Sequence, residues 1–171
     1  MMIQIYTGNG KGKTTAALGL ACRSACAGRR VFIGQFLKGT ETSELRLQDR
    51  FPGLILIEQF GRPCLIGPEG PGPEDIAMAG AGLARIRAVI AEGSWNVIVA
   101  DEICVAVRTG VVSEEEVLDL GRRCPESLEL IFTGRYATPA MIELADLVTE
   151  MVEVKHYYSS GKVPAREGIE F

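Results

Sequence analysis

The sequence predicts an α/β protein in which a mostly parallel sheet of about six strands lies between two layers of helices. Short apolar runs alternate with segments of helical pattern, which is typical of β-α-β units. A glycine-rich turn also stands between the first apolar run and the first helical segment, as in nucleotide-binding proteins of this class. The 171 residues fit a single domain spanning residues 1–171.

Six apolar segments predict the strands. Each is short and is bounded by polar, glycine or proline residues. Continuous apolar runs such as residues 97–100 indicate strands that are buried on both faces. The predicted strands are residues 3–6, 31–36, 54–59, 97–100, 128–132 and 147–154.

Three helices are predicted between these strands. Residues 14–27 are rich in alanine and end before Gly28, which suits a helix C-terminus. Residues 74–92 carry apolar side chains at helical spacing, although Gly80 and Gly82 each lower helix propensity by roughly 1 kcal/mol. Ser113 is a predicted N-cap, because three glutamates follow it in a first turn that favours acidic residues, and this helix should run to about Arg123.

Two segments are predicted to lack regular structure. Residues 61–73 hold four prolines and four glycines, which indicates a long functional or mobile loop. Residues 156–171 contain a Ser-Ser-Gly turn followed by a tail.

Composition excludes several classes of protein. The net charge of −4 provides no electrostatic footprint for a nucleic acid or an anionic membrane. No apolar run approaches the ~18 residues of a membrane-spanning helix. The N-terminus has no secretory signal, so a cytoplasmic protein with reduced cysteines is expected.

Cys22 and Cys26 stand four apart on a predicted helix, where they either share a metal or are simply buried.

Residues 7–15, Thr-Gly-Asn-Gly-Lys-Gly-Lys-Thr-Thr, carry the strongest functional signal. The glycines let backbone N–H groups turn inward around phosphate oxygens, and the helix that follows adds its positive N-terminus. Lys13 supplies a cation, and Thr14 offers its hydroxyl to Mg²⁺. The segment matches the end of the P-loop pattern, although Thr7 replaces the pattern's first glycine. We therefore expect a nucleotide or another polyphosphate to bind here.

Other candidates follow the later strands. Asp101 and Glu102 end an apolar strand, where carboxylates reach a Mg²⁺ beside the phosphates or are merely solvated. Arg135, in a Thr-Gly-Arg turn after the fifth strand, either clamps phosphate or lies on the surface. His156 is the single histidine and is either structural or functional, and Arg23 either reaches back toward the site or is solvated.

The P-loop does not specify which bond of the nucleotide is broken, since kinases, ATPases, GTPases and transferases all use it. The chain has no Asn-Lys-x-Asp guanine signature, which favours ATP. With one histidine and no basic stripe, a triad hydrolase or a DNA motor has little support.

Six motifs together resemble the ATP:corrinoid adenosyltransferases of the P-loop type, and the resemblance covers essentially the whole chain. They are residues 7–17, Gln-Phe-Leu-Lys-Gly at 35–39, Val-Ala-Asp-Glu at 99–102, Phe-Thr-Gly-Arg at 132–135, Val-Lys-His at 154–156 and Gly-Ile-Glu-Phe at 168–171.

The resemblance implies transfer of the 5′-deoxyadenosyl group of ATP to the Co(I) centre of a corrinoid, with release of triphosphate. It also implies a nucleotide bound in the reverse sense to a kinase, a homodimer, and a separate flavin- or ferredoxin-type electron donor. Carried over by position, the nucleotide-binding residues are Gly8, Asn9, Gly10, Lys11, Gly12, Lys13, Thr14, Thr15, Arg23 and Lys38, joined by Arg135. The expected Mg²⁺ ligands are Thr14, Glu102 and Asp101, and the expected catalytic residues are Lys13, Thr14, Glu102 and His156.

The chain departs from the family pattern in two places. Only two residues precede the first predicted strand, where relatives carry a segment that folds over the corrinoid. Gly-Arg-Pro-Cys at 61–64 replaces an aromatic stretch whose side chains displace the lower ligand of cobalt. Phe60, Leu65 or Ile66 serves instead, or the acceptor lacks a nucleotide loop, or Cys64 has a role of its own.

Two other functions compete with this reading. A P-loop kinase or ATPase would expose the γ-phosphorus and release ADP, whereas a non-catalytic carrier would bind corrinoid or nucleotide without turnover.

Overall fold

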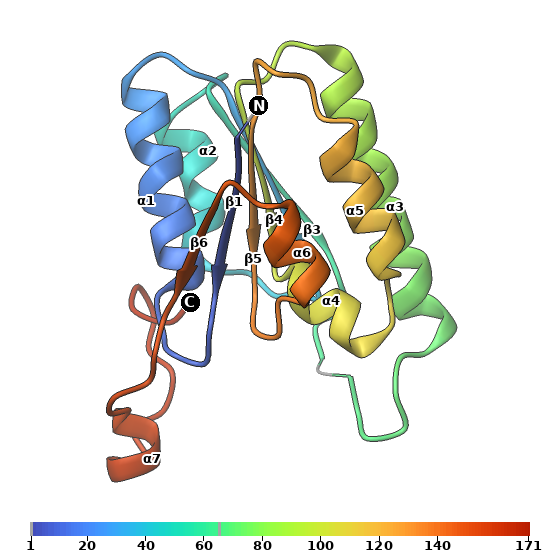
Figure 1. The fold of residues 1–171 in the computed structure, drawn as a ribbon. Coiled ribbons are helices and arrows are strands. Elements are labelled where there is room, and N and C mark those ends of the chain that lie inside the picture. Colours follow the sequence, from blue (N-terminus) through green and yellow to red (C-terminus); the bar gives the residue numbers. More distant parts are fainter. Residues whose placement is uncertain (1, 65) are drawn as a thin grey trace.

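The computed structural model describes residues 2–64 and 66–171. Six strands form one sheet in the order β3-β2-β4-β5-β1-β6, and every neighbouring pair is parallel (Figure 1). The strands are β1 (Met2–Thr7), β2 (Val31–Phe36), β3 (Ile55–Phe60), β4 (Val97–Asp101), β5 (Glu129–Thr133) and β6 (Leu147–Glu150). The predicted sheet of about six strands is confirmed, and it is entirely parallel.

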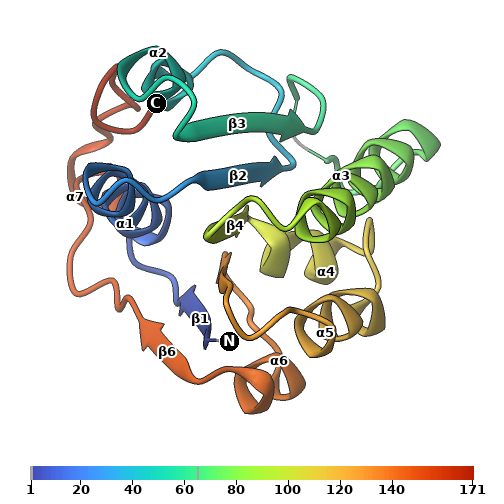
Figure 2. The same ribbon diagram turned by 90° about the horizontal axis from the view of Figure 1, so that it is seen from above.

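Helices cover both faces of the sheet. The helices α1 and α2 lie on one face and α3, α4, α5 and α6 on the other (Figure 2). Their bounds are α1 (Lys13–Cys26), α2 (Leu47–Arg50), α3 (Pro73–Glu92), α4 (Ile103–Thr109), α5 (Glu114–Arg122), α6 (Pro139–Leu144) and α7 (Tyr157–Gly161), and a 3-10 turn, η1 (Ser43–Arg46), precedes α2. None of the helices in the described part of the chain has both the length and the apolar character that crossing a bilayer requires.

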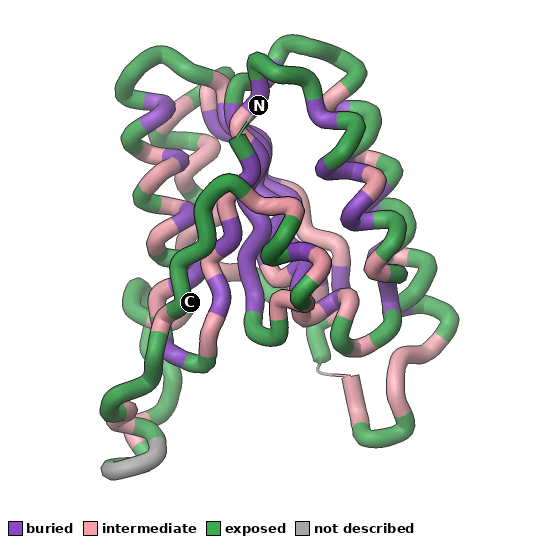
Figure 3. Tube along the Cα trace, in the orientation of Figure 1, coloured by how far each residue is buried: buried purple, intermediate pink, exposed green. Residues whose placement is uncertain are grey.

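Two apolar clusters hold the layers together. One lies between the sheet and the α3 side and includes Phe32, Leu83 and Phe132, and the other lies under α1 and includes Ala17 and Val99. All residues of β2 and β4 are buried, which explains their uninterrupted apolar runs. Figure 3 shows this buried interior in contrast to the exposed C-terminal segment.

The predicted ends of most elements agree with the structure to within one residue, but two predictions were wrong. The last strand ends at Glu150 rather than at residue 154, because the strand beside it, β1, turns away into the glycine-rich loop after Thr7. Val152 and Val154 are consequently exposed. Residues 156–171 are not wholly irregular, since they contain the short helix α7, for which His156 is the N-cap.

Parallel pairing determines where the functional segments meet. The carboxyl ends of β1, β2, β4 and β5 lie at one edge of the sheet. The glycine-rich loop follows β1, residues 37–39 follow β2, Glu102 follows β4 and Gly134 follows β5. Ligand sites of open parallel sheets form at this edge.

Candidate nucleotide and acceptor site

The glycine-rich loop encloses the side chain of Lys13. Its ammonium donates hydrogen bonds of 2.8 Å to the carbonyl oxygens of Gly8 and Gly10. Burial lowers the pKa of Lys13, an effect that the negative charge of Glu102 opposes. A cation is thus held inside the loop at the start of α1, where the helix N-terminus also attracts anions.

The glycines of the loop are required by a neighbouring segment as well as by phosphate. Gly8 has a φ of 93°, and a Cβ at this residue would lie 2.4 Å from the carbonyl oxygen of Met151. A Cβ at Gly10 would lie 2.8 Å from the same oxygen, which accepts a 2.7 Å hydrogen bond from Gly10 N. The loop is therefore packed against the backbone that follows β6.

Asp101 is a fully buried carboxylate that accepts hydrogen bonds from four side chains. Oδ1 accepts from Thr14 Oγ1 at 2.9 Å and from Thr133 Oγ1 at 2.6 Å. Oδ2 accepts from Lys38 Nζ at 2.9 Å and from Gln35 Nε2 at 3.2 Å. These bonds join α1, β5 and the end of β2 to the end of β4, so the carboxylate is held in one orientation.

Lys38 is the cation that balances this acidic group. Its ammonium forms an ion pair with Asp101 and lies 3.6 Å from Glu44 Oε1. Burial alone would lower the pKa of Lys38, but the charge and hydrogen bond of Asp101 outweigh burial, and the pKa is raised. Lys38 therefore stays protonated at the edge of the site.

Glu102 has a backbone conformation that is uncommon for a residue with a side chain. Its φ of 61° lies in the left-handed region, and it is the N-cap of α4. Its N–H donates a 2.9 Å hydrogen bond to Thr133 Oγ1, which helps to hold this conformation. Burial, and next the negative charge of Asp101, raise the pKa of Glu102. Strained residues of this kind cluster at functional sites.

Lys13 and Glu102 line a cavity of about 480 Å³, a size typical of small-molecule sites. An adjoining cavity of about 670 Å³ shares Thr14, Thr15 and Glu102 with it and extends to Lys38. The first cavity is lined by Gly10, Lys11, Gly12, Lys13, Thr14, Thr15, Glu102, Val105, Arg135, His156, Ile169 and Glu170.

The oxygen atoms around this cavity suit a hard divalent cation. Thr14 Oγ1 and Asp101 Oδ1 already lie 2.9 Å apart, and Glu102 lines the same cavity. Mg²⁺ prefers such oxygens and completes its shell with phosphate and water. The residues present therefore fit the predicted ion.

His156 lies at the mouth of the cavity. Its Nδ1 accepts a 3.1 Å hydrogen bond from Tyr158 N and so caps α7. Its ring centroid lies 4.7 Å from that of Tyr157. The histidine therefore has a structural bond and a place in the site at the same time.

Four predicted residues line neither this cavity nor the adjoining one. Gly8 and Asp101 accept hydrogen bonds from two residues that do line it, Lys13 and Thr14. The other two, Arg23 and Asn9, are not brought to the site. Arg23 is exposed in the last turn of α1, ten residues beyond Lys13, which corresponds to roughly 15 Å along the helix axis. Asn9 is exposed in the loop and is not among the residues that line either cavity. Cys22 is half-buried and Cys26 exposed, and no three potential ligands among His, Cys, Asp and Glu in residues 2–64 and 66–171 gather as a metal-binding group.

Reasoning from individual residues missed the buried Gln35, and it also missed the contacts of Tyr157 and Glu170 with Lys11. Gln35 and Glu170 lie in motifs that carried the family resemblance, and this was the available signal.

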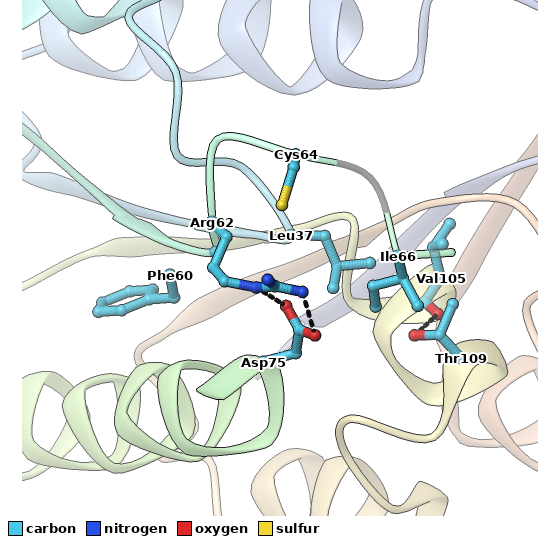
Figure 4. Close-up of a pocket in the computed structure, with 9 residues that line it drawn as sticks. Leu37, Phe60, Arg62, Cys64, Ile66, Asp75, Val105 and Thr109 are labelled. Atoms are coloured by element: carbon cyan, nitrogen blue, oxygen red, sulfur yellow. Dashed lines mark hydrogen bonds and ion pairs between the residues drawn. The ribbon is translucent and has the colours of Figure 1, made fainter. Parts of the chain in front are cut away.

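A third and more apolar cavity, of about 250 Å³, is shown in Figure 4 and is called the apolar cavity below. It lies beside the 480 Å³ cavity. Phe60, Cys64 and Ile66 line the apolar cavity, and Val105 lines both cavities. Of the three residues predicted to act at the lower face of cobalt, Phe60 and Ile66 therefore line one cavity, whereas Leu65 lies outside the described residues. Cys64, for which a role of its own was the alternative, lines the same cavity.

A bidentate ion pair forms one wall of the apolar cavity. Arg62 Nε donates to Asp75 Oδ1 at 2.6 Å, and Arg62 Nη2 donates to Oδ2 at 2.7 Å. Asp75 Oδ2 also accepts from Gly72 N at 2.8 Å. The pair therefore ties the loop after β3 to the first turn of α3.

A solved structure with a related fold is a KaiC-like protein of Pyrococcus horikoshii OT3, with a TM-score of 0.56 at 20% identity. The match covers 90% of this chain and 72% of that one. It supports the P-loop-type α/β fold alone.

Relatives in sequence are more informative. The chain is 33% identical over 171 residues to a corrinoid adenosyltransferase of Pseudomonas aeruginosa, with 99% of this chain and 83% of that protein covered. It is 32% identical over 176 residues to a corrinoid adenosyltransferase of Escherichia coli K12, with 99% and 85% covered. An uncharacterized Nostoc protein is 37% identical over 167 residues, and the match spans 44% of its length.

The family model of the ATP:corrinoid adenosyltransferases BtuR/CobO/CobP matches residues 1–171. The family predicted from the six motifs is thereby confirmed. The chain belongs to the ATP:corrinoid adenosyltransferase family.

Proposed function

We propose that this protein transfers the 5′-deoxyadenosyl group of ATP to the Co(I) centre of a corrinoid, cobalamin or cobyrinic acid a,c-diamide. Co(I) supplies the electron pair of the new cobalt–carbon bond to C5′, and the C5′–oxygen bond breaks so that triphosphate leaves with the other pair. Membership of the family supports this activity. The single observation in the site that carries it is the buried Lys13 inside a glycine-rich loop, a cradle for a polyphosphate leaving group.

The residues present suit a reaction that needs no general base, because Co(I) is itself a strong nucleophile. Lys13 and the N–H groups of the loop would stabilise negative charge on the departing triphosphate. Thr14, Asp101 and Glu102 would hold Mg²⁺, which supplies further positive charge beside the phosphates. Arg135 lines the cavity and would add a bidentate contact to phosphate oxygens. Lys38 lines the adjoining cavity and would add a contact through its single ammonium.

We further propose that the apolar cavity lined by Phe60, Cys64 and Ile66 faces the acceptor. For attack by cobalt, C5′ must point away from the cradle, so the nucleotide lies in the reverse sense to that in a kinase. Val105 is shared by the two cavities, which supports an acceptor held directly beside the phosphates. Phe60 and Ile66 offer apolar contact to the face of the corrin ring. His156 lies at the mouth of the phosphate cavity, where it would act on the corrinoid step.

The deciding experiment mixes the protein with Mg-ATP and chemically reduced cob(I)alamin in the absence of oxygen. We expect a light-sensitive cobalt–carbon product in the visible spectrum and an equal amount of triphosphate. Release of ADP and phosphate with unchanged corrinoid, for cobalamin and cobyrinic acid a,c-diamide alike, would assign the protein to the P-loop kinases or ATPases. Stoichiometric binding without turnover would identify a carrier.

The family resemblance also leads us to propose a cytoplasmic homodimer that receives electrons from a separate flavin- or ferredoxin-type donor. Sedimentation equilibrium tests the dimer. Reduction of Co(II) corrinoid on the protein by a purified flavodoxin or ferredoxin, with and without ATP, tests the donor.

A further inference from the structure

Residues 166–171 form a strap that contributes to the walls of both cavities of the candidate nucleotide site. This C-terminal strap, residues 166–171, contributes Ile169 and Glu170 to the wall of the phosphate cavity. Gly168 and Phe171 line the adjoining cavity, and the carbonyl oxygen of Phe171 accepts a 3.0 Å hydrogen bond from Ser43 Oγ. In Figure 2 the C-terminus lies beside α2, on the face of the sheet that α1 covers. Any ligand of these cavities must therefore contact or displace the strap.

One carboxylate attaches the strap to the glycine-rich loop. Glu170 Oε1 lies 2.5 Å from the ammonium of Lys11, which also donates a 2.8 Å hydrogen bond to the Tyr157 hydroxyl. The Tyr157 hydroxyl donates in turn to Glu170. On the strap itself, Arg166 N donates to Glu170 Oε2 at 2.8 Å, and Arg166 Nη2 lies 3.3 Å from Oε1.

This carboxylate is an anion under all ordinary conditions. Hydrogen bonds from Arg166, Lys11 and Tyr157, in that order of size, hold the pKa of Glu170 far below its usual range. Its side chain is 19% exposed and lines a cavity that is also lined by residues 10–15 of the P-loop, by Arg135 and by a second carboxylate, Glu102. Glu170 thus presents a negative charge and acceptor oxygens where a phosphate group would present the same.

A bound triphosphate would compete with Glu170 for the same cation. Lys11 lines the same cavity as the loop residues that are expected to bind phosphate, and its ammonium is paired there with Glu170. A triphosphate carries more negative charge than one carboxylate and would therefore attract the Lys11 ammonium more strongly, and the two anions would repel each other. Entry of a polyphosphate should therefore break the bond between Lys11 and Glu170.

We propose that Glu170 competes with the triphosphate for Lys11. Glu170 is paired with Lys11 until a polyphosphate enters, and entry of the polyphosphate then releases both Lys11 and the C-terminal strap. The inference rests on the proposed binding of the triphosphate at the P-loop. It adds a rearrangement of that site on binding, since Glu170 and the strap form part of the cavity wall until an anion of sufficient charge replaces Glu170 at Lys11.

The test is calorimetric titration of the 171-residue protein with inorganic triphosphate and Mg²⁺, which requires neither ATP nor corrinoid. The charge on Glu170 is removed in Glu170→Gln. The matched control is Glu167→Gln, because Glu167 lies on the same strap, is exposed, and has one distant ion pair of 4.0 Å with Arg46. We expect Glu170→Gln to bind triphosphate about three- to tenfold more tightly, and Glu167→Gln to differ less than about twofold from wild type.

A second variant, Tyr157→Phe, removes the hydroxyl that bonds to Glu170 and Lys11 without changing the net charge. We expect a smaller gain in affinity in the same direction, and thermal unfolding will show whether each variant is folded. Hydrogen exchange of residues 166–171 should rise when triphosphate is added to wild type and should already be fast in Glu170→Gln.

Three results with the variants and the strap would overturn the proposal, and a fourth concerns wild type. The first three are equal affinities of the two glutamine variants, weaker binding by Glu170→Gln, and a strap that becomes more protected on addition of triphosphate. Weaker binding would make Glu170 a ligand of the nucleotide. Absence of triphosphate binding to wild type would overturn it as well, whereas tight binding without adenosyl transfer would count against the proposed function alone.

Discussion

The Thr14 hydroxyl donates a 2.9 Å hydrogen bond to Asp101 Oδ1 and so joins the first turn of α1 to the carboxyl end of β4. Both oxygens belong to the group proposed to hold Mg²⁺. Because Asp101 is fully buried and accepts from three further side chains, Thr14 is the one member of this pair that also lines the cavity.

We therefore expect Thr14→Val to reduce kcat/KM for ATP by at least about tenfold and to raise the Mg²⁺ concentration needed for half-maximal rate. Valine keeps the shape of threonine but has no oxygen ligand. Thr14→Ser, which retains the hydroxyl, should stay within about threefold of wild type. A Thr14→Val protein with the Mg²⁺ dependence of wild type would remove Thr14 from the metal site.

Replacement of Lys13 tests the cradle itself. Lys13→Ala removes the cation that the loop encloses, and we expect at least a ~10-fold loss in kcat/KM for ATP, on the order of 1.4 kcal/mol of transition-state stabilisation. Lys162→Ala removes the same charge from an exposed position near the C-terminus and should leave these kinetics unchanged. Steady-state assays of both variants at saturating corrinoid make the comparison, and equal kinetics for the two would contradict the assignment.

Replacing Glu102 with glutamine should raise the thermal stability of the protein and lower its activity. Burial raises the pKa of Glu102 in the folded protein, so the folded state binds the proton more tightly than the unfolded chain does. The stability that this provides is present below the unfolded pKa of about 4.3 and is lost as the pH rises through the folded value. Glutamine carries no charge, so at about pH 7.5 Glu102→Gln should have a higher Tm than wild type and lower adenosyl transfer.

Thermal unfolding of Glu102→Gln and wild type between about pH 4 and pH 8 measures this difference, which should shrink toward the acid end. Glu167→Gln is exposed and should show no comparable gain. If Glu102→Gln unfolds at a lower temperature than wild type at pH 7.5, the charge of Glu102 stabilises the ligand-free protein and the prediction fails.

His156 requires two substitutions, because it caps α7 and is also proposed to act on the corrinoid step. His156→Ala removes the imidazole and also the N-cap of α7, whereas His156→Asn keeps a good cap. We expect both variants to lose activity mainly through the corrinoid step, with KM for ATP changed less than about twofold. Recovery of full activity in His156→Asn would show that His156 serves only to hold α7.

Much of the fold could be predicted from the sequence because its signals are local. The uninterrupted apolar run of β4 and the capping of α5 by Ser113 are each encoded within a few residues, and both elements form where expected. The end of β6 was not predictable in this way. Residues 151–154 have suitable apolar side chains, but the strand ends where its partner β1 departs, which is a property of the pairing.

The candidate site also combines residues that could be placed from the sequence with residues whose position depends on tertiary contacts. Lys13, Thr14 and Asp101 could be placed together because the carboxyl ends of parallel strands meet at one edge of a sheet. Arg23 was expected near them but lies at the far end of its helix. The pairing of Lys11 with Glu170 joins residues 159 positions apart, and it depends on how the C-terminal segment folds back over the loop, for which the sequence has no local pattern.

The contact between the glycine-rich loop and the backbone of Met151 affects how variants of this site should be interpreted. A methyl group at Gly8 or Gly10 would collide with main-chain atoms of Met151, a residue that lines neither cavity of the candidate nucleotide site. Alanine substitutions there would distort the cradle even if no phosphate ever touched those residues. Loss of activity in such variants would report on the seating of the loop against its own chain, and side-chain variants at Lys13 and Thr14 are the ones that report on the nucleotide.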